Sequence, residues 1–225
     1  MNGVRFTRVR LAANPSLGLI ALTHRLREYD RVLKAGAWEH LDERRTLNYP
    51  IRERAGRTLG IVGYGALGRG VARNAEAFDM RVWVANRPGD APVEGRLDLV
   101  ELPPLVDVLS LHCPLTPAPR NLIGAPELSR TKRDAVLINT ARGGLVDAGA
   151  LAAALRAGRL GGAAIDVLTE EPPVAGNPLL APDLGQVIVT PHTAWAAREA
   201  RQRAIDELAA NVEDFLAGGR RCRVV

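Results

Sequence analysis

"TLGIVGYGALGRGVARNAEAFDMRVWVANRPG" runs from Thr58 to Gly89 and combines the patterns of two strands, a glycine loop and a helix. The apolar run Leu59–Val62 has the length of a short buried strand. A glycine-rich loop follows it and opens a predicted helix over Ala66–Phe78. A second apolar run, Arg81–Ala85, comes soon after that helix. This order of elements predicts a parallel sheet whose glycine loop holds a dinucleotide.

The glycines of this loop are Gly63, Gly65 and Gly68, in the pattern G-x-G-x-x-G. The first glycine permits the tight turn, the second lets the backbone approach a pyrophosphate, and the third lets helix and strand pack closely. The amides of Ala66 and Leu67 then lie at a helix N-terminus, where the free N–H groups and the helix dipole favour an anion. The alternative is a turn with packing glycines and no ligand.

The residues after the second strand bear on which dinucleotide is bound. A carboxylate at this position accepts hydrogen bonds from the adenosine ribose and repels a 2′-phosphate. This chain has Asn86 followed by Arg87 instead. Asn86 removes the repulsion, and Arg87 can pair with the phosphate. The sequence therefore favours NADP(H) over NAD(H); the alternative is that Arg87 is only solvated and both cofactors are accepted.

The rest of the chain alternates in the same way. Further apolar runs of strand length are Val106–Leu111, Ala135–Ile138, Ala163–Val167 and Val187–Val189. Helices are predicted over 17–37, over Asp147–Ala157 with Asp147 as N-cap, and over Ala194–Leu216, while 39–57 has the polarity of a loop. Continuously apolar strands that alternate with helices predict an α/β fold, a Rossmann-type doubly wound parallel sheet.

Composition excludes several classes of protein. The 225 residues are 47% hydrophobic with a net charge of +5, and the excess arginines are scattered singly rather than in a basic stripe. We therefore expect no nucleic-acid partner. Two cysteines, Cys113 and Cys222, give neither a disulfide framework nor a metal-type spacing. From this cysteine usage we expect a cytoplasmic protein without a metal site. No apolar run is long enough to span a bilayer, so we expect no membrane partner.

Three later stretches place chemically active side chains just past strand ends. Arg142 follows the strand of LINTARGGLVD, Asp166 and Glu171 follow that of AAIDVLTEEPP, and His192 follows that of VIVTPHTAW. Ligands of open parallel sheets bind at the carboxyl ends of the strands. Each residue alone has a purely structural explanation, but together, beside a cofactor loop, they predict a catalytic site.

These motifs carry a resemblance to a known family. The glycine loop, LHCPLT (Leu111–Thr116), INTARGG (Ile138–Gly144), IDVLTEEP (Ile165–Pro172) and TPHTAW (Thr190–Trp195) resemble those of the D-isomer-specific 2-hydroxyacid dehydrogenases. The resemblance implies hydride transfer between NAD(P)H and a small 2-oxoacid. Within the family, HTAW and EEPPVAGNPLL resemble the bacterial branch that interconverts hydroxypyruvate and D-glycerate, with glyoxylate and glycolate as the other expected pair.

The resemblance also implies a role for each residue. His192 would be the acid/base, Glu171 would hold its imidazole and stabilise the protonated form, and Arg142 would bind the substrate carboxylate or polarise its carbonyl. Asp166 would contact the nicotinamide side of the cofactor. The adenine and ribose path would be lined by Thr140, Ala141, Cys113 and Pro114.

The family pattern further implies three segments and a homodimer. Residues 1–50 would hold the interdomain helix and a remnant of the substrate domain, 51–194 the dinucleotide-binding domain, and 195–225 a C-terminal helix that returns to the substrate-domain side. Most of the usual N-terminal substrate domain is not recognisable before Leu17. The alternatives to an active dehydrogenase are therefore a truncated cofactor-binding fragment and a non-catalytic interaction protein of the same family.

Overall fold

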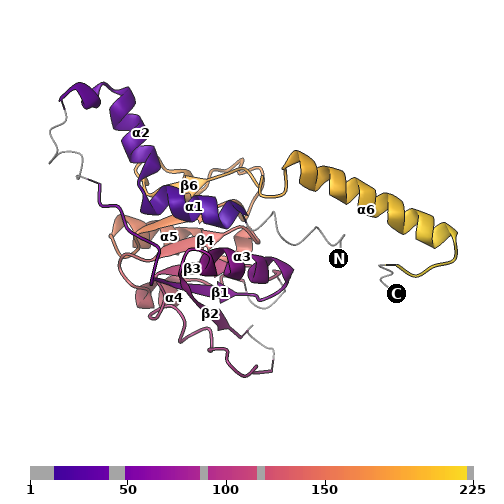
Figure 1. The fold of residues 1–225 in the computed structure, drawn as a ribbon. Helices are drawn as coiled ribbons and strands as arrows, with labels where there is room; N and C mark the ends of the chain where they lie inside the picture. Colours follow the sequence, from indigo (N-terminus) through magenta and orange to yellow (C-terminus); the bar gives the residue numbers. More distant parts are fainter. Residues whose placement is uncertain (1–12, 41–48, 87–90, 116–119, 222–225) are drawn as a thin grey trace.

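A computed structural model describes residues 13–40, 49–86, 91–115 and 120–221. Its centre is one six-stranded sheet in the order β2-β1-β3-β4-β5-β6, in which every neighbouring pair is parallel (Figure 1). The strands are β1 (Thr58–Val62), β2 (Arg81–Ala85), β3 (Val108–Leu111), β4 (Val136–Asn139), β5 (Gly162–Ile165) and β6 (Val187–Val189).

The burial pattern along the strands is typical of a parallel sheet covered on both faces. Every residue of β1, β3, β4 and β5 is buried, which requires a cover on both faces of the sheet. In the edge strand β2, exposed and half-buried residues alternate until Ala85, as expected where one face is partly open to solvent. The continuous apolar runs of the sequence therefore belong to the central strands.

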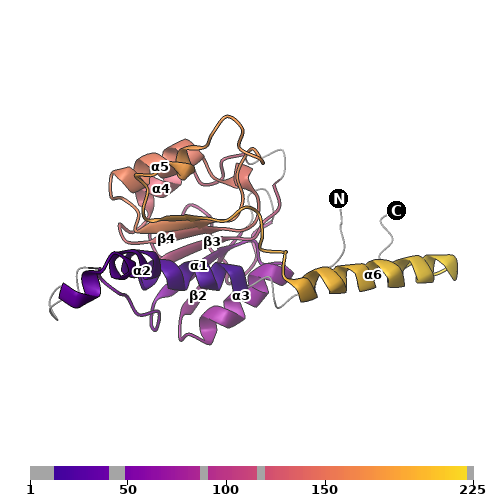
Figure 2. The same cartoon turned by 90° about the horizontal axis from the view of Figure 1, so that it is seen from above.

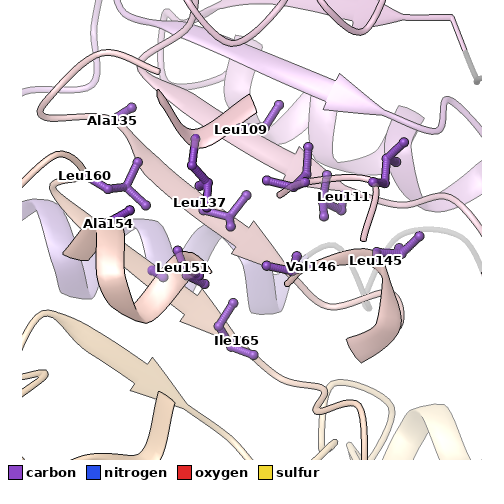
Figure 3. Close-up of a cluster of buried hydrophobic side chains, with 14 of the residues drawn as sticks. Leu109, Leu111, Ala135, Leu137, Leu145, Val146, Leu151, Ala154, Leu160 and Ile165 are labelled. Atoms are coloured by element: carbon purple, nitrogen blue, oxygen red, sulfur yellow. The ribbon is translucent and has the colours of Figure 1, made fainter. Parts of the chain in front are cut away.

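Helices pack on the two faces to form two core clusters. The helices α1 (Ala13–Thr23) and α3 (Ala66–Glu76) cover one face, where Leu19 and Leu22 join Val71 and Ala75. The helices α4 (Ala125–Arg130) and α5 (Ala148–Arg156) cover the other face, where their side chains meet the leucines of β3 and β4 (Figure 3). The predicted doubly wound α/β sheet is confirmed.

The strand order creates a switch point at the carboxyl ends of β1 and β3. From β1 the chain passes through α3 to β2 on one side, then crosses to β3 on the other side of β1. A single bridge, Ala85 with Leu97, extends the sheet beyond β2. Loops that leave the sheet in opposite directions at such a point form a crevice, which is where this class of fold binds ligands.

The prediction of one helix over 17–37 is wrong. The chain forms α1 and then α2 (Leu26–Lys34), separated by Arg25 in the left-handed region with φ 52°. Pro15 lies in the first turn of α1, where its missing N–H costs no helical hydrogen bond, so the helix begins earlier than expected. A short 3₁₀ segment, Ala37–His40, follows α2.

Other helices also differ from the sequence expectation. The last helix, α6, spans Arg198–Leu216 rather than beginning at Ala194, because the amide of Ala194 donates to Asp166 in a turn. The short helix α4 was not predicted; the carboxylate of Glu127 accepts the amide of Gly124 at 2.9 Å and caps its first turn. The strands β2 and β6 have the predicted bounds, and the ends of the other strands differ from the predicted ones by at most two residues.

Helix α6 extends away from the sheet (Figure 2). Of its 19 residues only Ala200 is buried, and five large apolar side chains are exposed: Ile205, Leu208, Val212, Phe215 and Leu216. Among the residues that the structure describes, no helix has both the length and the apolar character to cross a bilayer.

Candidate active site

The glycine loop between β1 and α3 has the shape that a pyrophosphate requires. Gly63 has φ 97°, and a Cβ there would lie 2.5 Å from the amide nitrogen of Cys113. A Cβ on Gly68 would strike the carbonyl oxygen of Gly63, whereas a Cβ on Gly65 would meet only open space. Two glycines thus pack the loop and the third leaves room for a ligand at the N-terminus of α3, next to Ala66 and Leu67. The residues present fit a dinucleotide.

The end of β2 is fixed by Asn86, whose side chain is turned into the protein. Asn86 is 9% exposed, and its Oδ1 accepts the amide of Val93 at 3.0 Å. Its Nδ2 lies 3.5 Å from the carboxylate of Asp98, and its backbone N–H donates to Leu97. Asn86 therefore anchors the following loop. Arg87 lies outside the described residues.

The other predicted cofactor residues occupy different environments. The side chain of Cys113 is buried in the core cluster under α5, while its backbone lies against Gly63; Pro114 is exposed. Thr140 and Ala141 follow β4 and are half-buried. Of these residues, Thr140 borders the same hollow as Asp166.

Glu171 and His192 form a hydrogen-bonded pair at the carboxyl ends of β5 and β6. His192 Nδ1 lies 2.7 Å from Glu171 Oε2, and the other carboxylate oxygen accepts the amide of Leu168 at 2.7 Å. Burial raises the pKa of the Glu171 carboxyl, but the hydrogen bonds from His192 and Leu168 outweigh it, aided by the charges of His192 and Arg142, so this pKa lies below its usual value. Glu171 is therefore an anion at neutral pH and holds the imidazole.

A network on Asp166 fixes the turn that presents His192. Asp166 is 2% exposed; one carboxylate oxygen accepts the hydroxyl of Thr190 at 2.5 Å and the amide of Thr193 at 2.9 Å, and the other accepts the amide of Ala194 at 2.9 Å. The backbone N–H of His192 also donates to the carbonyl of Asp166 at 2.7 Å. His192 itself has φ 52°, a left-handed conformation that costs energy in a side-chain-bearing residue.

Arg142 lies on the neighbouring turn after β4. Its guanidinium is exposed and donates to the carbonyl of Ala141 at 2.6 Å. The side chain of Asn139, 1% exposed, ties this turn by donating to the Arg142 carbonyl and accepting the amide of Ala141. Since Arg142, Glu171 and His192 follow the parallel strands β4, β5 and β6, the structure brings all three predicted catalytic residues to one edge of the sheet.

Two hollows adjoin this edge. One, about 480 Å³, is bordered by both Glu171 and His192 as well as by Pro172, Pro173 and Leu180. The other, about 240 Å³, lies on the α1 side and is bordered by Thr140, Asp166 and Thr190. The described residues contain no cluster of metal ligands. The site therefore offers a hydrogen-bonded carboxylate–imidazole pair and an arginine at the same edge of the sheet as the glycine loop, with a hollow beside the pair.

Comparison with known proteins agrees with this geometry. The family model for the D-isomer specific 2-hydroxyacid dehydrogenase NAD binding domain matches residues 17–194. The chain belongs to this dehydrogenase family. It therefore carries a domain that binds a nicotinamide dinucleotide, and the loop at Gly63–Gly68 and the three polar side chains at the strand ends all lie inside the matched range.

Individual relatives extend the match. A glycerate dehydrogenase of Methylorubrum extorquens is 47% identical over 200 residues, 89% of this chain and 63% of that protein. A hydroxypyruvate reductase of Blautia hydrogenotrophica is 32% identical over 204 residues, with the same two coverages. The chain thus spans less than two thirds of these curated relatives.

Solved structures give the same picture of this dehydrogenase domain. The TT0316 protein of Thermus thermophilus is 36% identical, with a TM-score of 0.83 over 96% of this chain and 67% of that one. An acyclic imino acid reductase (Bsp5), solved in complex with NADPH and D-Arg, is 32% identical, with a TM-score of 0.82 over 95% of this chain and 66% of that one.

Proposed function

We propose that this dehydrogenase domain catalyses the NAD(P)H-dependent reduction of a small 2-oxoacid, with hydroxypyruvate giving D-glycerate as the first candidate and glyoxylate as the second. The observation that carries the proposal is the 2.7 Å pair of His192 Nδ1 and Glu171 Oε2, which lies at the same edge of the sheet as the dinucleotide loop. The likeness to a glycerate dehydrogenase and a hydroxypyruvate reductase supports this choice of substrate.

The histidine supplies the proton. A bound reduced nicotinamide supplies a hydride to the carbonyl carbon of the substrate. Because Nδ1 of His192 is held by Glu171, the proton for the carbonyl oxygen comes from Nε2 of the imidazolium. Reduction leaves a 2-hydroxyacid and a neutral imidazole whose remaining N–H points at Glu171. The anionic Glu171 holds the imidazole at Nδ1 and leaves Nε2 for the substrate.

Arg142 recognises the acid. Its planar guanidinium matches a carboxylate with two parallel hydrogen bonds, and it can also stabilise negative charge that develops on the carbonyl oxygen. The side chain is exposed and lies on a turn tied by Asn139, so its backbone is fixed while its guanidinium can turn toward a substrate. Arg142 thus complements the acid/base pair.

Three finer features belong to the same proposal. NADP(H) is the favoured cofactor because the end of β2 carries the neutral Asn86 in place of a carboxylate. The roles of the segments 1–50, 51–194 and 195–225 belong to the proposal, and the exposed apolar face of α6 supports a C-terminal helix that returns to the substrate-domain side. The homodimer and the cytoplasmic location stay predictions.

The test measures initial rates of NADPH and NADH oxidation in parallel, with hydroxypyruvate or glyoxylate added to the purified chain. The proposal predicts turnover with hydroxypyruvate and a higher kcat/KM with NADPH. A folded protein that binds the cofactor without turnover would indicate a cofactor-binding fragment and contradict the proposed activity. Faster turnover with NADH would contradict only the cofactor preference.

A further inference from the structure

We propose that Arg96 binds the 2′-phosphate of NADP(H). Arg96 is not part of the glycine motif, but the fold places its guanidinium against the glycine loop. This inference rests on the proposed dehydrogenase function and adds a residue that sets the choice of cofactor. It is carried by the backbone pairing beside β2, by the contact of Arg96 with Tyr64 and by the charges at this corner of the site.

The backbone fixes Arg96 next to the end of β2. The amide of Leu97 donates to the carbonyl of Val84 at 3.0 Å, and the amide of Asn86 donates to the carbonyl of Leu97 at 2.8 Å. Leu97 packs against the core on the α5 face of the sheet. In an extended segment the preceding side chain points to the opposite face, so Arg96 is directed toward the α3 side.

On that side Arg96 meets the glycine loop. Its guanidinium carbon lies 5.7 Å from the centre of the Tyr64 ring, at the distance of a cation–π contact. Tyr64 stands between Gly63 and Gly65, so this contact places a positive charge directly at the loop. Arg69 donates to the Tyr64 carbonyl at 3.1 Å and lies close to the same residue.

The charges at this corner favour an added anion. Arg96 forms no ion pair with any residue that the structure describes, so its N–H groups are available to a phosphate. Asn86 is neutral, and its amide is committed to Val93 and Asp98. The Asp98 carboxylate acts in the opposite direction, because its negative charge would repel a 2′-phosphate if Arg96 were absent. Arg96 therefore supplies a positive charge that offsets the Asp98 carboxylate at this corner of the site.

The experiment measures the binding of four nucleotides to the full chain by fluorescence or calorimetric titration. NADPH and 2′,5′-ADP carry the 2′-phosphate, whereas NADH and 5′-AMP lack it. We expect Arg96→Gln to weaken NADPH and 2′,5′-ADP about tenfold, the loss of one charge-assisted contact, and to change NADH and 5′-AMP less than twofold. Arg96→Lys keeps the charge and should lose less.

The matched control is Arg73→Gln, which removes an exposed arginine from the last turn of α3, and it should leave all four affinities unchanged. Arg96→Gln with wild-type affinity for NADPH, or with an equal loss for NADPH and NADH, would overturn the inference. In both cases the proposed function stands if the wild-type chain binds a nicotinamide cofactor and reduces hydroxypyruvate. A wild-type chain that binds neither cofactor would overturn both.

Discussion

Gly143 lies where the turn that carries Arg142 meets the loop that carries Glu171. A Cβ on Gly143 would strike the backbone of Leu168 and Thr169, which cannot give way as a flexible side chain would. We expect Gly143→Ala to separate the two loops and misplace Arg142 relative to the acid/base pair. Since small misplacements of catalytic groups cost large factors in rate, kcat/KM should fall at least tenfold.

Gly144→Ala is the matched control for this prediction. A Cβ on Gly144 would lie 3.0 Å from the end of the Leu115 side chain, which can shift. Steady-state kinetics of both variants, with thermal unfolding to confirm the fold, decide the question. Equal activity of the two variants would show that the backbone contact at Gly143 does not position the site.

The placement of Arg142, Glu171 and His192 at one edge could be predicted from the sequence because each follows an apolar strand, and parallel strands end at one edge. The residues that support them could not. Asp166 was expected to contact the nicotinamide, which stays a prediction; the structure adds that its carboxylate accepts the hydrogen bonds that hold the turn of His192. The sequence did not predict that Asn139 ties the turn of Arg142, nor did it single out Arg96 as a cofactor residue. Their partners are set by turn geometry and by a loop pairing, which leave no periodic pattern in the sequence.

At the scale of elements, α5 begins at a cap that the sequence predicted and the structure confirms. The side chain of Asp147 accepts the amide of Ala150 at 2.9 Å. We expect Asp147→Ala to lower the free energy of unfolding by about 1 kcal/mol, because it leaves a helix-end amide without its partner. Asp147→Ser keeps an acceptor and should retain most of the stability. Chemical denaturation of both variants tests this, and an equal loss in both would contradict the cap.

The elements that were predicted well are those with a strong period or a complete local signal. The strands were apparent as continuous apolar runs, and α3 and α5 had a start and a stop in the sequence. The break between α1 and α2 was missed because Arg25, rather than a glycine, takes the left-handed conformation. The short helix α4 was missed because its six residues carry too few turns to show a period.

At the scale of the whole molecule, His112 makes stability depend on pH. Burial lowers the pKa of this histidine to about 4, from an ordinary value of 6.5, and its Nε2 lies 2.8 Å from Ser110 Oγ. Between pH 6.5 and 4 the unfolded chain therefore binds more protons than the folded one, so stability falls as the pH falls. This loss amounts to about 2 kcal/mol by pH 5 and vanishes above the unfolded pKa.

Urea unfolding of the wild type and of His112→Gln at pH 7 and pH 5 checks this prediction. Relative to pH 7, the free energy of unfolding of the variant should rise against that of the wild type at pH 5. Carboxylates whose pKa is lowered, such as Glu171 and Asp107, also lose stabilisation in acid, but they are present in both proteins and cancel. A difference that does not change between the two pH values would show that His112 can be protonated without cost in the folded state.

We propose that His192, held by Glu171, gives the proton in a reduction by NAD(P)H. The most direct test compares wild type and His192→Gln in two measurements, hydroxypyruvate-dependent NADPH oxidation and the Kd for NADPH. We expect that the wild type turns over, that the variant loses at least a hundredfold in kcat, and that its Kd stays within about twofold of the wild type. A variant that keeps its activity, or that loses cofactor affinity as much as turnover, would contradict it.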